Sequence, residues 1–231
     1  MAWRVTADPL RFDEAVDWFQ QRVQLPDPAF RALSDSARRR AFWVAGAVQA
    51  DVIESVFDVL DRAVDEGVLF PDFLEEVGEK LEREWAGSVA DPGTRLETIY
   101  RTNIQGSYNS GRFQQQRDPD VVAARPFWMY DAILDDRTSE ICEALDGTIR
   151  EATDPWWDTR YSPNHWNCRA SVRSLTRTQA ERRGGPTREP TDVLPLEQFR
   201  ASPSLDEWQP DTSQYHPEIR AALEAKAGMG L

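Results

Sequence analysis

The chain has 231 residues, of which 40% are apolar and nine are tryptophan, so it can build a folded core and wholesale disorder is excluded. Its net charge of −13 excludes a protein whose whole surface grips a phosphate backbone. No apolar run reaches the roughly 20 residues of a membrane span, and the N-terminus lacks the apolar core of a signal peptide. We therefore expect synthesis in a cytoplasm and no membrane contact.

Helical patterns begin close to the N-terminus. We expect a first helix to start at Asp8-Pro9, an N-cap followed by proline, and to end at Pro26 and Pro28. A second, longer helix is expected over residues 34–66, because apolar residues recur there at helical spacing. Gly67 follows this helix where a left-handed cap residue belongs.

Two further helices are expected over residues 71–86 and 92–116, and Asp-Pro pairs stand on both sides of the second. Its later turns contain Gly106 and Gly111 among serines. Small side chains at these spacings allow another backbone to approach closely. We expect a close helix contact at this place.

The pattern changes after residue 120. The apolar run 126–134 predicts a buried strand, and a short helix is expected to end near Gly147. A second strand is expected from Thr148, and residues 165–173 alternate as a strand with one buried face. The residues expected on that buried face are Trp166, Cys168, Ala170 and Val172.

These elements predict an α+β protein, with a helical N-terminal region packed on a small C-terminal sheet. We divide it into a helical region, residues 1–118, and an α+β core, residues 119–183. Residues 184–231 are rich in proline and polar side chains up to about residue 216, which predicts an extended arm, with disorder as the alternative, and a short helix over 217–227.

Charge is distributed unevenly. Residues 51–100 contain fourteen acidic and four basic side chains, a balance of −10. Residues 160–188 contain seven arginines and one glutamate, a balance of +6. This basic stretch is the candidate surface for DNA or a protein partner, and we favour protein because the rest of the chain would repel DNA. The candidate contact residues are Arg169, Arg173, Arg177, Arg182 and Arg183.

Several polar and aromatic residues of the second half are predicted to be structural. Asp136 or Thr138 would cap the short helix, and Arg137 would form a buried ion pair that fixes the turn. Trp156 would cover the sheet. Two residues of the helix over 92–116, Arg101 and Asn103, are expected to hydrogen-bond the strand region.

Two stretches are more particular than these general patterns. Residues 99–115 contain Y-R-T-N and a Gly-Arg pair, and residues 130–175 contain D-x-R-T, then D-P-W, then P-x-x-x-N-C-R. F-x-x-A-x-x-W-F at 12–19 and A-F-x-V-A-G at 41–46 precede them. Over residues 10–178 the chain resembles the phage Mu F-like minor head protein family, also called phage head morphogenesis proteins.

The resemblance implies a structural minor head protein of a tailed phage or prophage-derived particle, and not an enzyme. It implies a place inside the virion head near the portal, after synthesis in the bacterial host cytoplasm. The implied partners are the portal and other head proteins. Self-association and weak, non-specific DNA contact are further expectations.

The resemblance also bears on metal binding, since many family members place cysteine or histidine near the D-x-R-T turn and in a final C-R-C. Here those positions are Ser139, Cys142, Cys168 and Ala170, and only two of the four are ligands; His165 could add a third. Structural zinc prefers four ligands, so the expectation is no cofactor, with zinc as an alternative. Otherwise the two cysteines are reduced, small, buried hydrophobes that are close in space.

A nucleophilic pair is the remaining alternative. Cys142 with His165, oriented by Asp135 or Asp136, would act on nucleic acid or peptide. Against it, Cys142 is expected in mid-helix, without a glycine-rich elbow or an oxyanion hole.

Overall fold

The structure is a computed structural model that describes residues 11–33, 38, 41–187, 191–201, 203, 217, 220, 221 and 224. The helices are α1 (Asp13–Gln20), α2 (Asp27–Arg31), α4 (Ala50–Asp65), α5 (Phe70–Trp85), α6 (Pro92–Arg117), α7 (Pro119–Ala124), α8 (Glu140–Leu145), α9 (Trp157–Arg160), α10 (Arg177–Glu181) and the 3-10 helix η1 (Glu197–Phe199). The strands are β1 (Val23–Gln24), β2 (Ala41–Phe42), β3 (Phe127–Asp131), β4 (Ile149–Glu151) and β5 (Ser171–Leu175).

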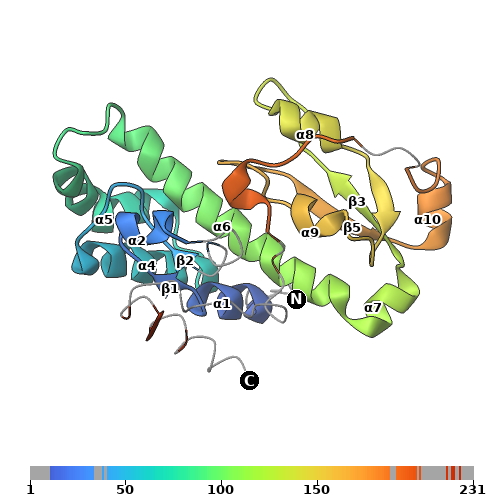
Figure 1. Ribbon diagram of the computed structural model, residues 1–231, viewed down its shortest axis with the longest axis horizontal. Coiled ribbons are helices and arrows are strands. Elements are labelled where there is room, and N and C mark those ends of the chain that lie inside the picture. Colours follow the sequence, from blue (N-terminus) through green and yellow to red (C-terminus); the bar gives the residue numbers. More distant parts are fainter. Residues whose placement is uncertain are drawn as a thin grey trace, which may run out of the picture.

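Figure 1 shows helices on one side, a small sheet on the other, and α6 running along both. The expected α+β class is therefore confirmed, with the helices N-terminal and the sheet C-terminal. The predicted domain limits at 118 and 183 stay a prediction. The predicted arm is described only in part, and most of the expected helix over 217–227 lies outside the described residues.

The helical core forms where α1, α4 and α5 bury their apolar faces against the first half of α6. Phe19 of α1 stacks on Phe57 of α4 with ring centroids 4.7 Å apart, and Phe42 meets the same ring edge-on at 5.1 Å. Leu96 brings α6 into this cluster. Burial of these side chains removes apolar surface from water, which is the main force that holds the four helices together.

The expected helix over residues 34–66 is wrong over residues 41–49, whereas most of residues 34–40 lie outside the described residues. Ala41 and Phe42 form β2, which pairs in parallel with β1, and α4 begins only at Ala50. Between them Gly46 has a φ of +81°, a conformation that turns the chain and favours glycine. Apolar residues of this segment are buried in a short strand and a turn. Their spacing resembles that of a helix, and periodicity alone does not distinguish the two.

The first helix also differs from its prediction. Asp8 and Pro9 lie outside the described residues, and α1 begins at Asp13. It ends at Gln20, before either proline. Pro28 does not close α1 but lies in the first turn of α2. The N–H groups of a first helical turn have no partner within the helix, so proline, which has no N–H, fits there without loss.

The other helix ends follow their sequence signals. The Asp91 carboxylate accepts the backbone N–H of Thr94 at 3.0 Å and caps α6, and Asp118 caps α7 in the same way. Gly67 has a φ of +80°, as expected for the residue after α4. The short helix α8 ends two residues before Gly147, which also has a positive φ.

Gly111 confirms the close helix contact expected in α6. A Cβ atom at this position would lie 2.6 Å from the backbone N of Ala15 in α1. Gly106, one and a half turns earlier, has no atom closer than 4.0 Å to its own hypothetical Cβ, namely Pro163 Cγ. Of these two glycines, therefore, Gly111 is the one that sets the distance between α1 and α6, which lie side by side in Figure 1.

The sheet has the order β4-β3-β5 and is antiparallel throughout. Trp128 of β3 lies opposite Arg150 of β4 and Ser174 of β5. Its ring packs against Trp157 and Tyr161, and Phe113 from the second half of α6 closes the cluster. A second core therefore lies between the sheet, α9 and α6. Trp156, which was expected to cover the sheet, packs against this core and is partly buried.

The strand expected over 165–173 is shifted. β5 spans Ser171–Leu175, and residues 165–170 form a loop in which Asn167 has a φ of +55°. Trp166, expected on the buried face, is 38% exposed. Cys168 and Ala170 are buried because the loop folds inward, so alternating burial here reflects a loop and not a pleated strand.

None of the helices among the described residues is both long and apolar enough to cross a membrane.

Candidate functional site

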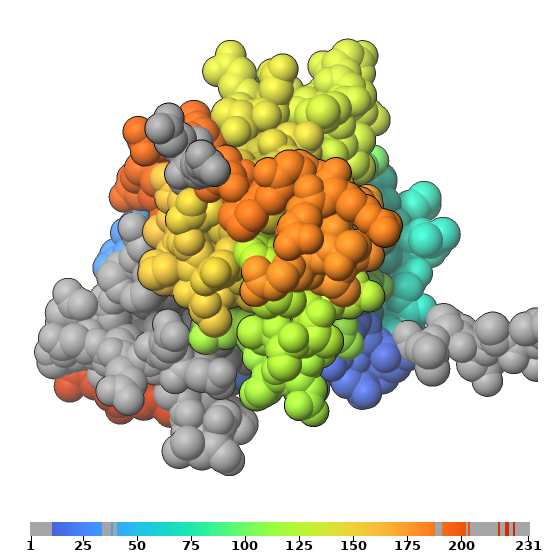
Figure 2. All heavy atoms as spheres, turned by 90° about the vertical axis from the view of Figure 1, so that its right-hand side faces the viewer, coloured from blue at the N-terminus to red at the C-terminus, as the bar shows by residue number. Residues whose placement is uncertain are grey.

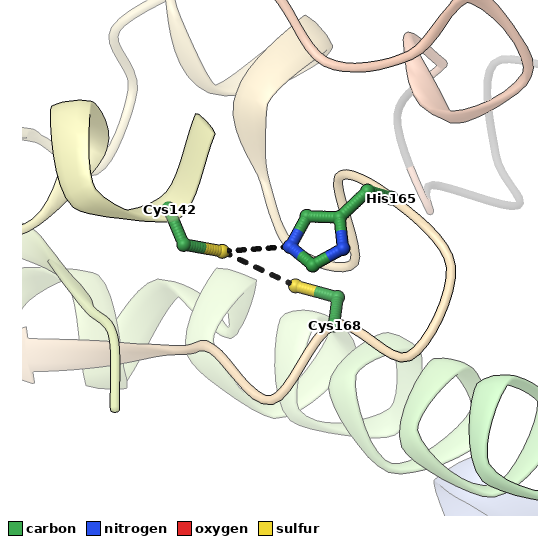
Figure 3. Close-up of side chains that lie close together, drawn as sticks. All are labelled: Cys142, His165 and Cys168. Carbon is green, nitrogen blue, oxygen red and sulfur yellow. Dashed lines mark hydrogen bonds between the residues drawn. The ribbon is translucent and has the colours of Figure 1, made fainter. Parts of the chain in front are cut away.

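Three potential metal-binding or nucleophilic side chains meet beside β3. Cys142 comes from α8, whereas His165 and Cys168 come from the loop before β5 (Figure 3). Cys142 Sγ lies 3.1 Å from His165 Nε2 and 3.7 Å from Cys168 Sγ. The three ligand atoms all lie within 4.8 Å of one another, and we call them the Cys-His-Cys cluster.

Local hydrogen bonds place Cys142 in this cluster. Ser139 is the N-cap of α8, and its Oγ accepts the backbone N–H of Cys142 at 3.1 Å. The same Oγ lies 2.7 Å from His165 Nε2. The cap of α8 therefore also joins the helix to the loop before β5.

The loop that supplies His165 and Cys168 is held from several sides. The amide of Asn164, a fully buried side chain, donates to Arg160 O at 3.0 Å and to the Tyr130 hydroxyl at 2.9 Å. Further along, the carbonyl of Ala170 accepts hydrogen bonds from Gln105 and Asn109 of α6. Both ends of the loop are thus anchored to regular structure, which fixes the two ligands between them.

The protonation of His165 follows from its neighbours. Nδ1 lies 2.7 Å from the carbonyl oxygen of Trp166, and since a carbonyl only accepts, Nδ1 carries a proton and donates. In the neutral ring, Nε2 therefore presents its lone pair to Cys142 and Ser139. Burial lowers the pKa of His165, but hydrogen bonds to Cys142 and to the Trp166 carbonyl outweigh it and raise the pKa above its ordinary value.

The contact between the two thiols shifts their pKa values in opposite directions. The hydrogen bond between Cys142 and Cys168, followed by burial, raises the pKa of Cys142 to about 12. The same hydrogen bond, supported by backbone hydrogen bonds from Asn164 and Ala170, lowers the pKa of Cys168 to about 6. Burial and the adjacent sulfurs raise the pKa of Tyr130. Cys142, the thiol beside the imidazole, is thus a weak source of thiolate and a poor nucleophile.

Among the described residues, both thiols of the cluster are shielded from solvent. Cys142 and Cys168 are 4% and 3% exposed. A groove of about 790 Å³ lies elsewhere, between the helices and the loop before β5, and none of the three cluster residues is among the described residues that line it. Its aromatic and basic lining includes Trp18, Arg22, Phe30, Trp43, Trp166 and Phe199.

The predicted turn at 135–138 is held differently from expectation. Ser139 caps α8, so the assignment of this role to Asp136 or Thr138 is wrong; the Thr138 hydroxyl instead donates to Ile133 O. Arg137 has a side chain that is 73% exposed and forms no buried ion pair. The ion pair of this turn is formed by Arg169 instead, whose Nη1 lies 2.7 Å from Asp135 Oδ2.

Arg101 and Asn103 do not reach the strand region. Arg101 pairs with Glu97 on its own helix, and Asn103 donates to Ile99 O and accepts from Arg22. Three other side chains of α6 do bridge to it, and sequence reasoning missed them: Gln105, Asn109 and Gln116. A signal was present, because they are polar residues that point from the helix at spacings of four and seven.

Gln116 makes a buried bridge with two partners. Its Nε2 donates to Val172 O at 2.8 Å, and its Oε1 accepts the buried Tyr161 hydroxyl at 3.1 Å. We expect Gln116→Met to lower the free energy of unfolding by about 1–2 kcal/mol, because it leaves buried polar groups without partners. Urea denaturation of Gln116→Met, with the exposed neighbour Gln115→Met as reference, measures the loss; equal values for the two variants would contradict it.

The candidate arginines lie at the sheet end of the molecule. Figure 2 looks onto this end and shows the segment around α10 across its centre. Arg169 and Arg173 pair with Asp135 and Asp131, and Arg177 stacks over Phe127 at 5.3 Å. Arg182 and Arg183 are exposed. The +6 stretch is therefore partly compensated by aspartates, and its role as a DNA or partner surface stays a prediction.

The Asp135–Arg169 pair makes stability depend on pH. The hydrogen bond from Arg169, followed by the Arg137 backbone N–H, holds the pKa of Asp135 well below its usual range. A carboxylate with a depressed pKa stabilises the fold above its unfolded pKa of about 3.9, and this contribution is lost as pH falls further. We expect Asp135→Asn to destabilise the protein at pH 7 and progressively less below pH ~4.

Urea denaturation at pH 7 and pH 3 measures this difference, and Asp136→Asn is the matched control because it removes the same charge one residue away. A deficit of Asp135→Asn that is independent of pH would show that the lost interaction is not ionic.

Residues 54–173, more than half of the chain, match the family model described as Phage Mu protein F like protein. The chain belongs to this family. The match runs from α4 to β5, so it includes α6, the sheet and all three residues of the Cys-His-Cys cluster. The family resemblance read from the sequence is thereby confirmed.

Two relatives extend the match. The chain is 32% identical over 186 residues to "Putative capsid assembly protein F" of Escherichia phage Mu, which covers 74% of this chain and 42% of that protein. It is 34% identical over 160 residues to "Mu-like prophage FluMu F protein" of Haemophilus influenzae, which covers 65% of this chain and 38% of that protein. The aligned part of the chain thus spans about two fifths of these relatives. No solved structure matches.

Proposed function

We propose that the chain is a structural minor head protein of a tailed phage or prophage-derived particle, and that it acts in head assembly. The observation that carries this proposal is the family match over residues 54–173, together with the likeness to a relative named for capsid assembly. In this proposal the chain works by binding other head proteins, the portal among them, and it resides inside the head near the portal.

The architecture suits a binding role. The Cys-His-Cys cluster and both cores are closed, and the polar side chains of α6 are used to hold loops in place. Apolar side chains reach solvent at the tip beside α8, where Ile133 and Leu134 are 51% and 60% exposed. The acidic face of α4 and α5 and the arginines around α10 offer opposite charges for partners or for sister copies.

Genetic removal tests the proposal directly. The gene for this chain is deleted from the phage or prophage that carries it, and the lysate is examined by electron microscopy and by protein analysis of purified particles. We expect few complete, DNA-filled heads, restoration by a plasmid copy, and presence of the chain together with the portal in wild-type particles. Normal heads without the chain would overturn the proposal.

The enzyme alternative rests on one contact, Cys142 Sγ to His165 Nε2 at 3.1 Å. A catalytic thiol must be accessible and readily ionised, and Cys142 is buried with a raised pKa. Alkylation by iodoacetamide separates the two functions. A structural thiol reacts only as fast as the protein unfolds, so modification of folded protein within minutes at pH 7 would favour the enzyme.

A further inference from the structure

The Cys-His-Cys cluster has the composition of a transition-metal site. Two sulfurs and one imidazole nitrogen converge from α8 and from the loop before β5. Among the described residues, no other group of three or more His, Cys, Asp or Glu side chains brings its ligand atoms close enough together to hold one metal ion. Thiolate and imidazole ligands together select zinc over the hard cations, which prefer oxygen. We propose that Cys142, His165 and Cys168 bind one zinc ion. The proposal stands apart from the proposed function, and either can fail alone.

The distance between the two sulfurs agrees with a tetrahedral ion. Bond lengths of about 2.3 Å to sulfur and 2.0–2.1 Å to nitrogen place two sulfurs about 3.8 Å apart and sulfur and nitrogen about 3.5 Å apart. The sulfurs of Cys142 and Cys168 lie 3.7 Å apart. Cys142 Sγ and His165 Nε2 lie 3.1 Å apart, and all three ligand atoms lie within 4.8 Å of one another, so the imidazole must shift for all three to reach one ion.

The imidazole is already oriented as a ligand. Because Nδ1 donates to the Trp166 carbonyl at 2.7 Å, the lone pair of the neutral ring is on Nε2, which faces the Cys142 sulfur. A hydrogen bond of this kind from the other ring nitrogen accompanies most histidine ligands of metals and fixes their orientation.

Nε2 has two neighbours, Ser139 Oγ at 2.7 Å and Cys142 Sγ at 3.1 Å. Without a metal, the Ser139 hydroxyl donates to the single lone pair of Nε2, and the Cys142 thiol pairs with Cys168. A zinc ion would instead take the lone pairs of Nε2 and both sulfurs at one centre.

Three protein ligands leave one tetrahedral position. Ser139 Oγ lies 2.7 Å from His165 Nε2, and its hydroxyl could hydrogen-bond a water molecule bound to the metal. The ion would tie α8 to the loop before β5 and so act as a structural clamp next to the buried Tyr130 hydroxyl, which is 3.3 Å from Cys142 Sγ.

Metal analysis of the full chain tests the proposal. The protein is produced without a histidine tag in zinc-supplemented medium and purified under reducing conditions. We expect about one zinc per chain, removable by chelators, and a lower thermal midpoint after its removal. Co²⁺ added to the chelator-treated protein should produce thiolate-to-cobalt absorption that Zn²⁺ abolishes. Free thiols without bound zinc and without this absorption would overturn the proposal, whether or not any variant folds.

Variants locate the ion. Cys142→Ser, Cys168→Ser and His165→Gln should each lose the metal, whereas His216→Gln, at the only other histidine, should retain it. Ser139→Cys adds a sulfur close to His165 as a fourth ligand and should lower the Kd for zinc at least about tenfold. Retention of zinc by the three ligand variants, or its loss from His216→Gln, would contradict the assignment.

Discussion

Trp128→Ala is expected to cause one of the largest losses of stability of any single substitution, about 3–5 kcal/mol of unfolding free energy. The Trp128 side chain is 1% exposed, and its ring contacts Phe113, Trp157 and Tyr161 with centroids 5.5–5.7 Å apart. Alanine leaves a cavity between the ring of Phe113 in α6 and the rings of Trp157 and Tyr161, which belong to α9 and its C-cap, and these rings cannot all move inward. Urea denaturation followed by far-UV circular dichroism measures the loss.

Two further variants isolate the cause. Trp128→Phe keeps an aromatic ring and removes an indole N–H that has no hydrogen-bond partner among the described residues, so it should retain most of the stability. Trp166→Ala removes a partly exposed tryptophan and should cost about 1 kcal/mol. A loss from Trp166→Ala as large as that from Trp128→Ala would show that the rings around Trp128 are not the core of this part.

Gly111→Ala is the second large effect, and its sign is unusual for a helix. Alanine stabilises an exposed helical position by about 1 kcal/mol relative to glycine. At Gly111, however, the added Cβ would lie 2.6 Å from the backbone N and 2.9 Å from the Cα of Ala15. Backbone atoms cannot rotate away, so α1 must move from α6, and we expect a net loss of about 3 kcal/mol.

Gly106→Ala and Gly78→Ala are the matched controls for this substitution. Both glycines lie inside helices, and a Cβ there meets no atom closer than 4.0 Å at Gly106 and none within 4 Å at Gly78. Both substitutions should therefore be neutral or stabilising by up to about 1 kcal/mol. Thermal and urea unfolding of the three variants tests the contrast; stabilisation of all three would mean that α1 and α6 do not approach as closely as described.

Local signals in the sequence predicted what depends on a few neighbouring residues. The Asp-Pro pair at 91–92 marks the start of α6, and Gly67 marks the end of α4, because capping is decided by the groups within one turn. The small residues of α6 predicted a close contact, but the partner at Gly111, α1, could not be identified from spacing alone.

Contacts between distant residues were the part that the sequence did not determine. Asp135 and Arg169 are 34 positions apart, and the ion pair was assigned to the adjacent Arg137 because only local neighbours were visible. The same holds for β2, whose pairing with β1 depends on an arrangement of both segments around the helical core. Cys142, His165 and Cys168 were identified as candidate ligands, yet their meeting depends on a loop that was expected to be a strand.

The length of α6 has a consequence for how the molecule unfolds. This single helix gives Leu96 to the core of the helices and Phe113 to the core beside the sheet, without a break between them. Melting of either core would expose one side of the helix and remove a wall from the other core. The two halves are therefore thermodynamically coupled, and they should lose structure in one cooperative transition, although their hydrophobic clusters are separate.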